Sequence, residues 1–300
     1  KLKISPVPAI IAIAISSNLQ GAATLVGDTT SILLGGYADL NFLDFFIFKG
    51  KIGLFWIVQM AALASVLILL YIFRKDNQPI SIDEKIKVED YFPSVLLLSM
   101  VFLLIGASFI PDTPKTINGI ICMSLFLAGL VVNFAKKRDK RHISKAILEI
   151  DLFTILLLSG LFIVVAGITE VGVVEDISKI FVKVSNDNIF VIYTIIVWFS
   201  VFISAFIDNI PYVATMLPVV TGISTLLQIE PYLMYFGLLS GATLGGNLTP
   251  IGASANITAL GILRKNGYEI RSSQFMKISI PFTLAAVMVG YIVVWVIWRT

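Results

Sequence analysis

Two polar, glycine-rich segments interrupt apolar stretches of this sequence and hold the side chains best suited to binding an ion. Residues 17–28 include Asn18, Thr24 and Asp28, and residues 241–256 include two asparagines, two threonines and a serine. In lipid, backbone groups without partners are costly, so an irregular segment at membrane depth survives only where it lines a buried cavity. Oxygen atoms of such segments coordinate cations, and the N-terminal ends of half-helices attract anions. The two breaks therefore predict a substrate or ion site between half-helices.

A third polar pair, Asp208-Asn209, separates two further apolar stretches, and we expect it to meet both breaks near the middle of the membrane. A carboxylate at that depth is costly and therefore indicates function. Because such a group can exchange a proton for a cation, Asp208 and Asp28 are the candidates for proton coupling. The candidate residues for binding the ion or substrate are Asn18, Thr24, Gly27, Asp28, Asp208, Asn209, Asn247, Thr249, Gly252, Ser254 and Asn256.

These polar residues also have structural explanations. An aspartate directly before a helix caps it, so capping competes with coupling at both carboxylates. We favour coupling for Asp208, whereas the two roles are balanced for Asp28. The asparagines and threonines can instead join helices through hydrogen bonds. With one cysteine, Cys122, and one histidine, His142, we expect no metal centre and no cofactor, only H⁺ or Na⁺ as coupling ion.

The composition places these segments in a lipid bilayer. The chain is 57% hydrophobic and 14% charged, with a mean hydropathy of +0.94, which excludes an ordinary soluble fold. We therefore expect an all-α polytopic membrane protein. The stretches long enough to cross a bilayer are 51–73, 91–110, 116–135, 152–168, 189–207 and 276–298.

Two basic loops predict the orientation of the chain. Loops 74–90 and 136–150 are rich in lysine and arginine, and two apolar spans separate them, so both lie on one side. The positive-inside rule makes that side cytoplasmic and predicts a multi-pass protein of the plasma (inner) membrane. This topogenic role explains the basic runs better than nucleic-acid binding, so we expect no nucleic-acid partner.

The two breaks also divide the chain into related parts. At an offset of 225, Gly21, Thr24 and Gly27 match Gly246, Thr249 and Gly252. On the predicted topology the breaks run in opposite directions, which is typical of inverted repeats, although glycine and threonine are common enough in membrane helices to match by chance. The expected parts are the end of a first repeat (1–73, a broken helix and one span), a linker (74–90) and a second repeat (91–300). The second repeat would contain scaffold spans, an interfacial amphipathic helix (170–187), a hairpin (188–227), a broken helix (231–264) and a last span.

The apolar pair around Asp208 is either two full crossings or a re-entrant hairpin. Both options return the chain to the same side, so loop charges do not decide between them. Pro218 and Gly222 would weaken a full span in the short second arm, and we therefore favour the hairpin.

The first break, the Asp208-Asn209 tip with residues 214–218, and the second break together resemble the ion transporter superfamily. The most similar branch is that of the arsenite-efflux permeases and related sodium/proton antiporters, and residues 151–154 and 160–162 look like that branch too. The chain also resembles the anion permeases of the sodium–dicarboxylate symporter type. The resemblance implies an inverted-repeat transporter fold with a hairpin in each repeat. It therefore implies a preceding N-terminal part that holds the first hairpin.

The main expectation is a secondary active transporter of a small inorganic ion or oxyanion, coupled to protons or another cation. Within it we expect arsenite or antimonite efflux or sodium/proton antiport. The alternative is a sodium-coupled permease for di- or tricarboxylates or other anions. A membrane-embedded enzyme is less expected, because Val26-Gly27-Asp28 lacks the Gly-x-Gly-Asp signature of intramembrane aspartyl proteases. A passive channel fits inverted broken helices less well. The sequence leaves a homodimer open.

Overall fold

The computed structural model describes residues 5–75, 90–110, 116–137 and 152–299, together with positions 114, 148 and 150. The two loops expected to be cytoplasmic lie almost wholly outside these residues, as do His142 and Asp151. Their predicted sidedness therefore stays a prediction.

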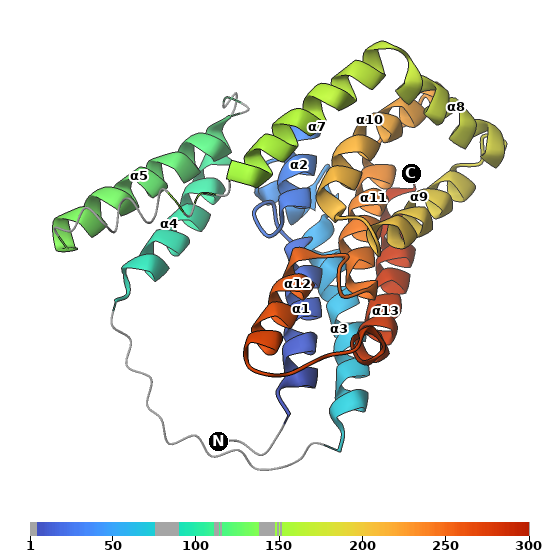
Figure 1. The fold of residues 1–300 in the computed structure, drawn as a ribbon. Coiled ribbons are helices and arrows are strands. Elements are labelled where there is room, and N and C mark those ends of the chain that lie inside the picture. The colour runs from blue at the N-terminus through green and yellow to red at the C-terminus, as the bar shows by residue number, and fades with distance from the viewer. Residues whose placement is uncertain are drawn as a thin grey trace. The chain divides into compact units, whose positions relative to one another are not determined.

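The described chain is built almost entirely of helices (Figure 1). They are α1 Val7–Gly21, α2 Thr29–Tyr37, α3 Leu54–Phe73, α4 Phe92–Ala107, α5 Ile117–Lys137, α7 Leu152–Glu170, α8 Val173–Ser185, α9 Ile189–Ser204, α10 Asn209–Leu227, α11 Tyr232–Gly245, α12 Ser254–Lys265 and α13 Ser272–Trp298, with 3-10 turns η1 Leu43–Phe45 and η2 Gly246–Leu248. Within the described ranges, five helices are long and apolar enough to cross a membrane, or up to six if the bent pair α8–α9 forms one span. The protein is thus a helical, multi-pass membrane protein.

The chain forms two compact units. One comprises Lys1–Leu40, Asp44–Ile80 and Leu161–Thr300, and the other Asn41–Leu43 and Ser81–Gly160. In the smaller unit α4 packs against α5, where Gly129 lies close to the Leu96 side chain. Every predicted site residue belongs to the larger unit.

Both predicted breaks are confirmed. After α1 ends at Gly21, a run of turns leads to α2 at Thr29, and after α11 ends at Gly245 the chain passes through η2 before α12 begins at Ser254. Figure 1 shows α1 and α12 beside each other, and the two helices are in contact. The breaks therefore lie in one region of the larger unit although more than 200 residues of chain separate them.

The core of this unit is α11, which is buried from Leu233 to Gly245. It packs on α9 through glycines four residues apart. A methyl group on Gly241 would lie 2.5 Å from Val197 O, and one on Gly245 would lie 2.6 Å from Val201 Cα. This close helix contact through small residues holds the second break in place.

The chain before α3 differs from the expected span 51–73. Ile47–Phe48 (β1) and Lys51–Ile52 (β2) form a small antiparallel hairpin, and α3 begins only at Leu54. Lys49 and Gly50 have φ of +50° and +74°, the combination that a two-residue hairpin turn requires. A lysine in place of the usual asparagine, aspartate or glycine hides this signal from sequence reading.

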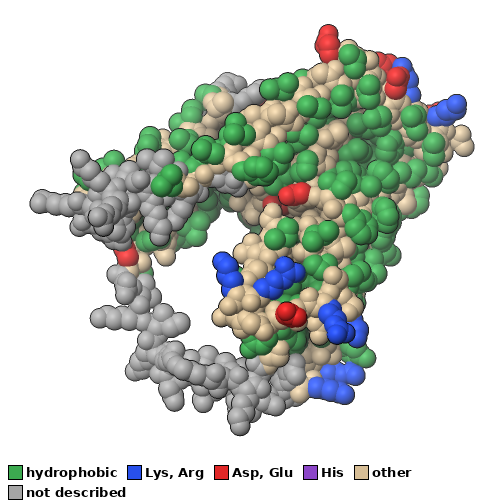
Figure 2. All heavy atoms as spheres, viewed as in Figure 1, with side chains coloured by type: hydrophobic (Ala, Val, Ile, Leu, Met, Phe, Trp, Pro, Cys, Tyr) green, Lys and Arg blue, Asp and Glu red, His purple; other side chains and the backbone are tan. Residues whose placement is uncertain are grey.

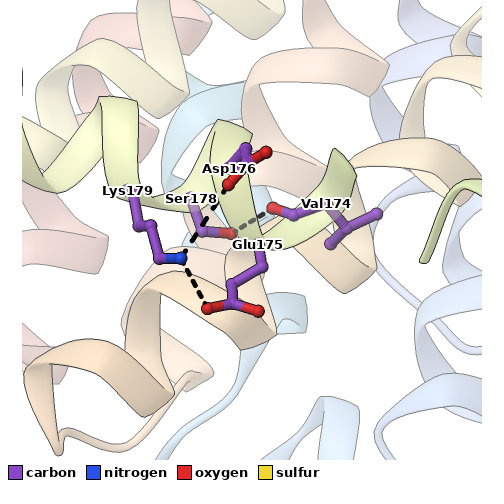
Figure 3. A network of polar contacts seen from close by, with 5 residues as sticks. All are labelled: Val174, Glu175, Asp176, Ser178 and Lys179. Atoms are coloured by element: carbon purple, nitrogen blue, oxygen red, sulfur yellow. Dashed lines mark hydrogen bonds and ion pairs between the residues drawn. The ribbon is translucent and has the colours of Figure 1, made fainter. Parts of the chain in front are cut away.

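The amphipathic helix expected over residues 170–187 is α8. Lys179 Nζ lies 2.7 Å from Glu175 and 3.8 Å from Asp176 on its exposed face (Figure 3). Ser178 of the same helix is buried, and its Oγ donates to Val219 O of α10 at 3.0 Å. The helix bends by 119° into α9. Its place at a membrane interface remains a prediction.

Positive charge gathers at one end of the larger unit. Arg74 and Lys75 follow α3, Arg264 and Lys265 end α12, and Arg271 precedes α13. Figure 2 shows lysine and arginine side chains together in the lower part of the view, where these helix ends lie. The positive-inside rule predicts that this end faces the cytoplasm.

Candidate ion- and substrate-binding site

A cavity of about 170 Å³ lies where the two breaks meet the start of α10. Three segments far apart in the sequence contribute to it: the first break, the tip between α9 and α10, and the start of α12. Its lining residues are Ser17, Asn18, Gly21, Gly27, Asp28, Thr29, Asn209, Ile210, Ser254 and Ala255. Residues from all three segments therefore line one cavity.

Three helix N-termini surround this cavity, and they differ in how they are capped. Asp28 Oδ1 accepts from Thr29 N at 2.7 Å and caps α2, while Asp208 Oδ1 accepts from Ile210 N at 3.2 Å and caps α10. The N-cap of α12 is Ala253, which offers no side-chain acceptor. The first backbone N–H groups of α12 therefore have no side-chain cap and can bind a negatively charged group.

Asp28 is half-buried at the centre of a polar network. Its Oδ2 accepts from Thr30 Oγ1 at 2.7 Å and from Asn209 Nδ2 at 3.5 Å. Thr30 is fully buried, and its hydroxyl lies 3.0 Å from Thr243 Oγ1 of α11. This carboxylate thus connects α2, α10 and α11.

Asp208 occupies a different environment from the one expected. Its side chain is exposed and does not line the cavity, whereas its neighbour Asn209 is 4% exposed and does. Of the two candidate coupling residues, only Asp28 lies in the cavity wall.

Two asparagines join α1 to the second break. Asn18 Nδ2 donates to Thr243 O at 2.7 Å and to Asn247 Oδ1 at 3.1 Å. Asn247 is fully buried, and its Nδ2 donates to Ile15 O at 2.9 Å. Asn18 also reaches the cavity, while Asn247 holds the helices together behind it.

The remaining residues of the second break fasten it to the α9–α10 tip. Thr249 Oγ1 donates to Ala205 O, and Asn256 Nδ2 donates to Gly246 O and Thr249 O, both at 3.1 Å. A methyl group on Gly252 would lie 2.6–2.9 Å from three backbone oxygens, so only glycine fits there. The buried Oδ1 of Asn256 has no hydrogen-bond partner within the described part of the chain.

The predicted site residues thus separate into those that line the cavity and those that support it. Asn18, Gly27, Asp28, Asn209 and Ser254 line it. The residues that support it from behind are Asn247, Thr249, Gly252 and Asn256. The backbone carbonyl of Thr24 accepts from Gly27 N at 3.1 Å in the turn of the first break. Sequence reasoning missed some lining residues, all adjacent to or within the quoted segments: Ser17, Gly21, Thr29, Ile210 and Ala255.

Comparison with known proteins gives a consistent result. Residues 1–241 match the citrate transporter family, CitMHS. The chain is 29% identical over 299 residues to an uncharacterized transporter of Mycobacterium tuberculosis. This alignment covers 98% of this chain and 68% of that protein. It is 29% identical over 301 residues to the 46 kDa membrane protein of Mycobacterium leprae, with the same coverage. The P protein of Mus musculus is 35% identical over 149 residues, or 47% of this chain and 18% of that protein.

Proposed function

This chain belongs to the citrate transporter family, and from that premise we propose that its cavity carries a small organic carboxylate together with a cation held at Asp28. The protein is a secondary transporter and not an enzyme. The family match supports the alternative expectation, an anion permease, better than arsenite efflux or sodium/proton antiport.

The observation that carries the proposal is the uncapped N-terminus of α12 at the cavity. The dipole of a helix places about half a positive charge at its N-terminus. Ser254 and Ala255, the first residues of α12, line the cavity, and the Ser254 hydroxyl adds a further donor. A volume of about 170 Å³ lies below the roughly 300 Å³ of a pocket for a drug-sized ligand, so it suits a small anion.

Asp28 explains why a cation would accompany the anion. A carboxylate cargo in this cavity would lie beside the Asp28 carboxylate. Two unit charges about 5 Å apart repel by about 3 kcal/mol at an effective dielectric constant of about 20. That repulsion weakens binding by about two orders of magnitude unless a proton or Na⁺ neutralises Asp28. Binding of the anion and of the cation would thus favour each other, which is the basis of coupled transport.

We further propose that the two breaks are inverted repeats, dividing the chain into parts 1–73 and 91–300. α2 and α12 begin 225 positions apart. Ser31 Oγ donates to Gly21 O at 3.2 Å, and the matching pair Asn256 Nδ2 and Gly246 O lies at 3.1 Å. Asn18 contacts Thr243, its own counterpart at this offset. Contact between equivalent residues is what a twofold axis between two repeats produces.

The test is coupled transport by the full-length protein in proteoliposomes, with citrate as cargo and imposed pH or sodium gradients. Asp28→Asn and Asp208→Asn form a matched pair, because each aspartate caps a helix and asparagine caps equally well. We expect Asp28→Asn to transport without dependence on either gradient, and Asp208→Asn to remain coupled.

Two outcomes would refute the proposal separately. Normal gradient dependence in Asp28→Asn would exclude Asp28 as the coupling group. If Asp208→Asn in addition lost its gradient dependence, coupling would be assigned to Asp208. A wild-type protein that moves arsenite or sodium but no carboxylate would refute the cargo class. Arsenite, sodium and dicarboxylates therefore belong in the same assay.

A further inference from the structure

A second cavity, of about 240 Å³, lies at the end of the larger unit where α9 and α11 begin and α13 ends. Its lining contains three cationic side chains, Lys49, Lys51 and Arg299, and one carboxylate, Glu230. Three cations and one carboxylate leave a formal charge of +2 on this wall. The cavity therefore attracts anions and repels cations.

The rest of the lining is apolar or aromatic. Ile189 and Leu233 come from the first turns of α9 and α11, and Trp298 closes α13. The Trp298 ring is 7% exposed, and its buried Nε1–H has no acceptor within the described chain. A cationic rim beside an apolar wall suits an amphiphile rather than a free ion.

The cationic rim is positioned by specific contacts. Lys49 adopts a φ of +50°, a conformation unusual for lysine, in the turn of the β1–β2 hairpin. Its Nζ lies 2.8 Å from Glu230 Oε2 and 4.5 Å from the centre of the Tyr232 ring. The hydrogen bond from Lys49 to Glu230 raises the pKa of Lys49, so the lysine stays charged. Lys51 Nζ lies 5.3 Å from the centre of the Trp298 ring.

We propose that this cavity binds the phosphate headgroup of an anionic phospholipid, with the first part of an acyl chain against Ile189 and Leu233. The cavity lies at the ends of the candidate spans α3 and α13. Tyrosine and tryptophan collect where membrane helices meet the headgroups, and cationic side chains near the membrane surface attract anionic lipid headgroups. Free phosphate or the carboxylate cargo would gain nothing from the apolar wall. This lipid site does not depend on the proposed function.

Quenching of tryptophan fluorescence by brominated lipids tests the site in the full-length protein. The chain has four tryptophans, so the difference between wild type and Trp298→Phe isolates the signal of Trp298. In phosphatidylcholine vesicles, brominated phosphatidylglycerol should quench this signal more strongly than brominated phosphatidylcholine at the same mole fraction. Lys49→Asn and Arg299→Gln should each weaken the preference for phosphatidylglycerol about fivefold.

The variants separate binding from folding. Asparagine is favoured at the turn position of Lys49, so Lys49→Asn should not unfold the hairpin. Lys179→Gln is the matched control, because Lys179 is an exposed lysine on α8 that pairs with Glu175 and Asp176 and is not among the residues that line the cavity. It should leave the lipid preference unchanged. Native mass spectrometry of retained phosphatidylglycerol gives a second measurement that does not need Trp298→Phe.

Three results would overturn the proposal. The first is equal quenching by the two brominated lipids, and the second is an unchanged preference in both Lys49→Asn and Arg299→Gln. The third is displacement of brominated phosphatidylglycerol by millimolar inorganic phosphate or citrate at matched ionic strength. That last result would show that the cavity takes a free anion instead of a lipid.

Discussion

Replacing Ser254 by aspartate tests whether the N-terminus of α12 binds the anion. Ser254 is the first residue of α12, follows an N-cap without a side-chain acceptor, and lines the cavity between the breaks. An acidic residue in the first turn stabilises a helix by about 0.3–1 kcal/mol. This gain offsets part of the repulsion between the new carboxylate and Asp28, which lines the same cavity, and thermal unfolding measures the net cost.

The same charge should exclude the cargo. A cavity of about 170 Å³ is about 7 Å across if treated as a sphere, so a bound carboxylate would lie about 5 Å from the new one. The repulsion is then about 3 kcal/mol at an effective dielectric constant of about 20. We expect the KM for the carboxylate to rise by about two orders of magnitude.

The assay is uptake of radiolabelled citrate into proteoliposomes, with thermal unfolding in detergent as the measure of folding. Ser254→Asn is the control, because it has nearly the size of aspartate but no charge. It should change KM by less than about tenfold. If Ser254→Asp keeps a KM within threefold of the wild type while its unfolding temperature is unchanged, the anion does not bind at α12.

Further predictions concern the second break and α8. Gly252→Ala should lower stability by about 1–3 kcal/mol and reduce transport, because its methyl group would overlap three backbone oxygens. Gly261→Ala, in the same region with open space around it, should instead raise stability by about 0.5–1 kcal/mol. Thermal unfolding of both variants compares them, and equal effects would contradict the packing argument. On α8, the hydrogen bond from Lys179 lowers the pKa of Glu175. The pair therefore stabilises the helix at neutral pH and stops doing so as the pH falls through that lowered pKa, and an NMR titration of Lys179→Gln should find the Glu175 pKa back at its ordinary value.

The breaks and the helices around them could be predicted from the sequence because their signals are local. Glycine and polar runs inside apolar stretches are costly in lipid, so residues 17–28 and 241–256 stand out without knowledge of the fold. α2 and α12 begin 225 positions apart, which is the offset at which the glycines of the two breaks align.

The roles of adjacent polar residues could not be predicted in the same way. Consecutive residues at the start of a helix point in directions about 100° apart, so a single position decides which side chain reaches the cavity. Asn209 lies in the cavity wall and Asp208 is exposed, and no pattern in the sequence fixes that rotation. Buried Thr30, which links Asp28 to Thr243, was missed for the same reason.

One position distinguishes the two breaks, and on the proposed repeat that difference suffices to produce coupling. Asp28 caps α2, and its counterpart at an offset of 225 is Ala253, before α12. With an aspartate at both positions, the cavity would hold two carboxylates and repel an anion until two cations had neutralised them. With alanine at both, two free N-termini would bind the anion without any need for a cation. With one of each, as proposed here, α12 would attract the carboxylate while Asp28 would oppose it until a proton or Na⁺ binds. On this proposal, coupling of the anion to a single cation therefore requires the two halves of the site to differ at this position.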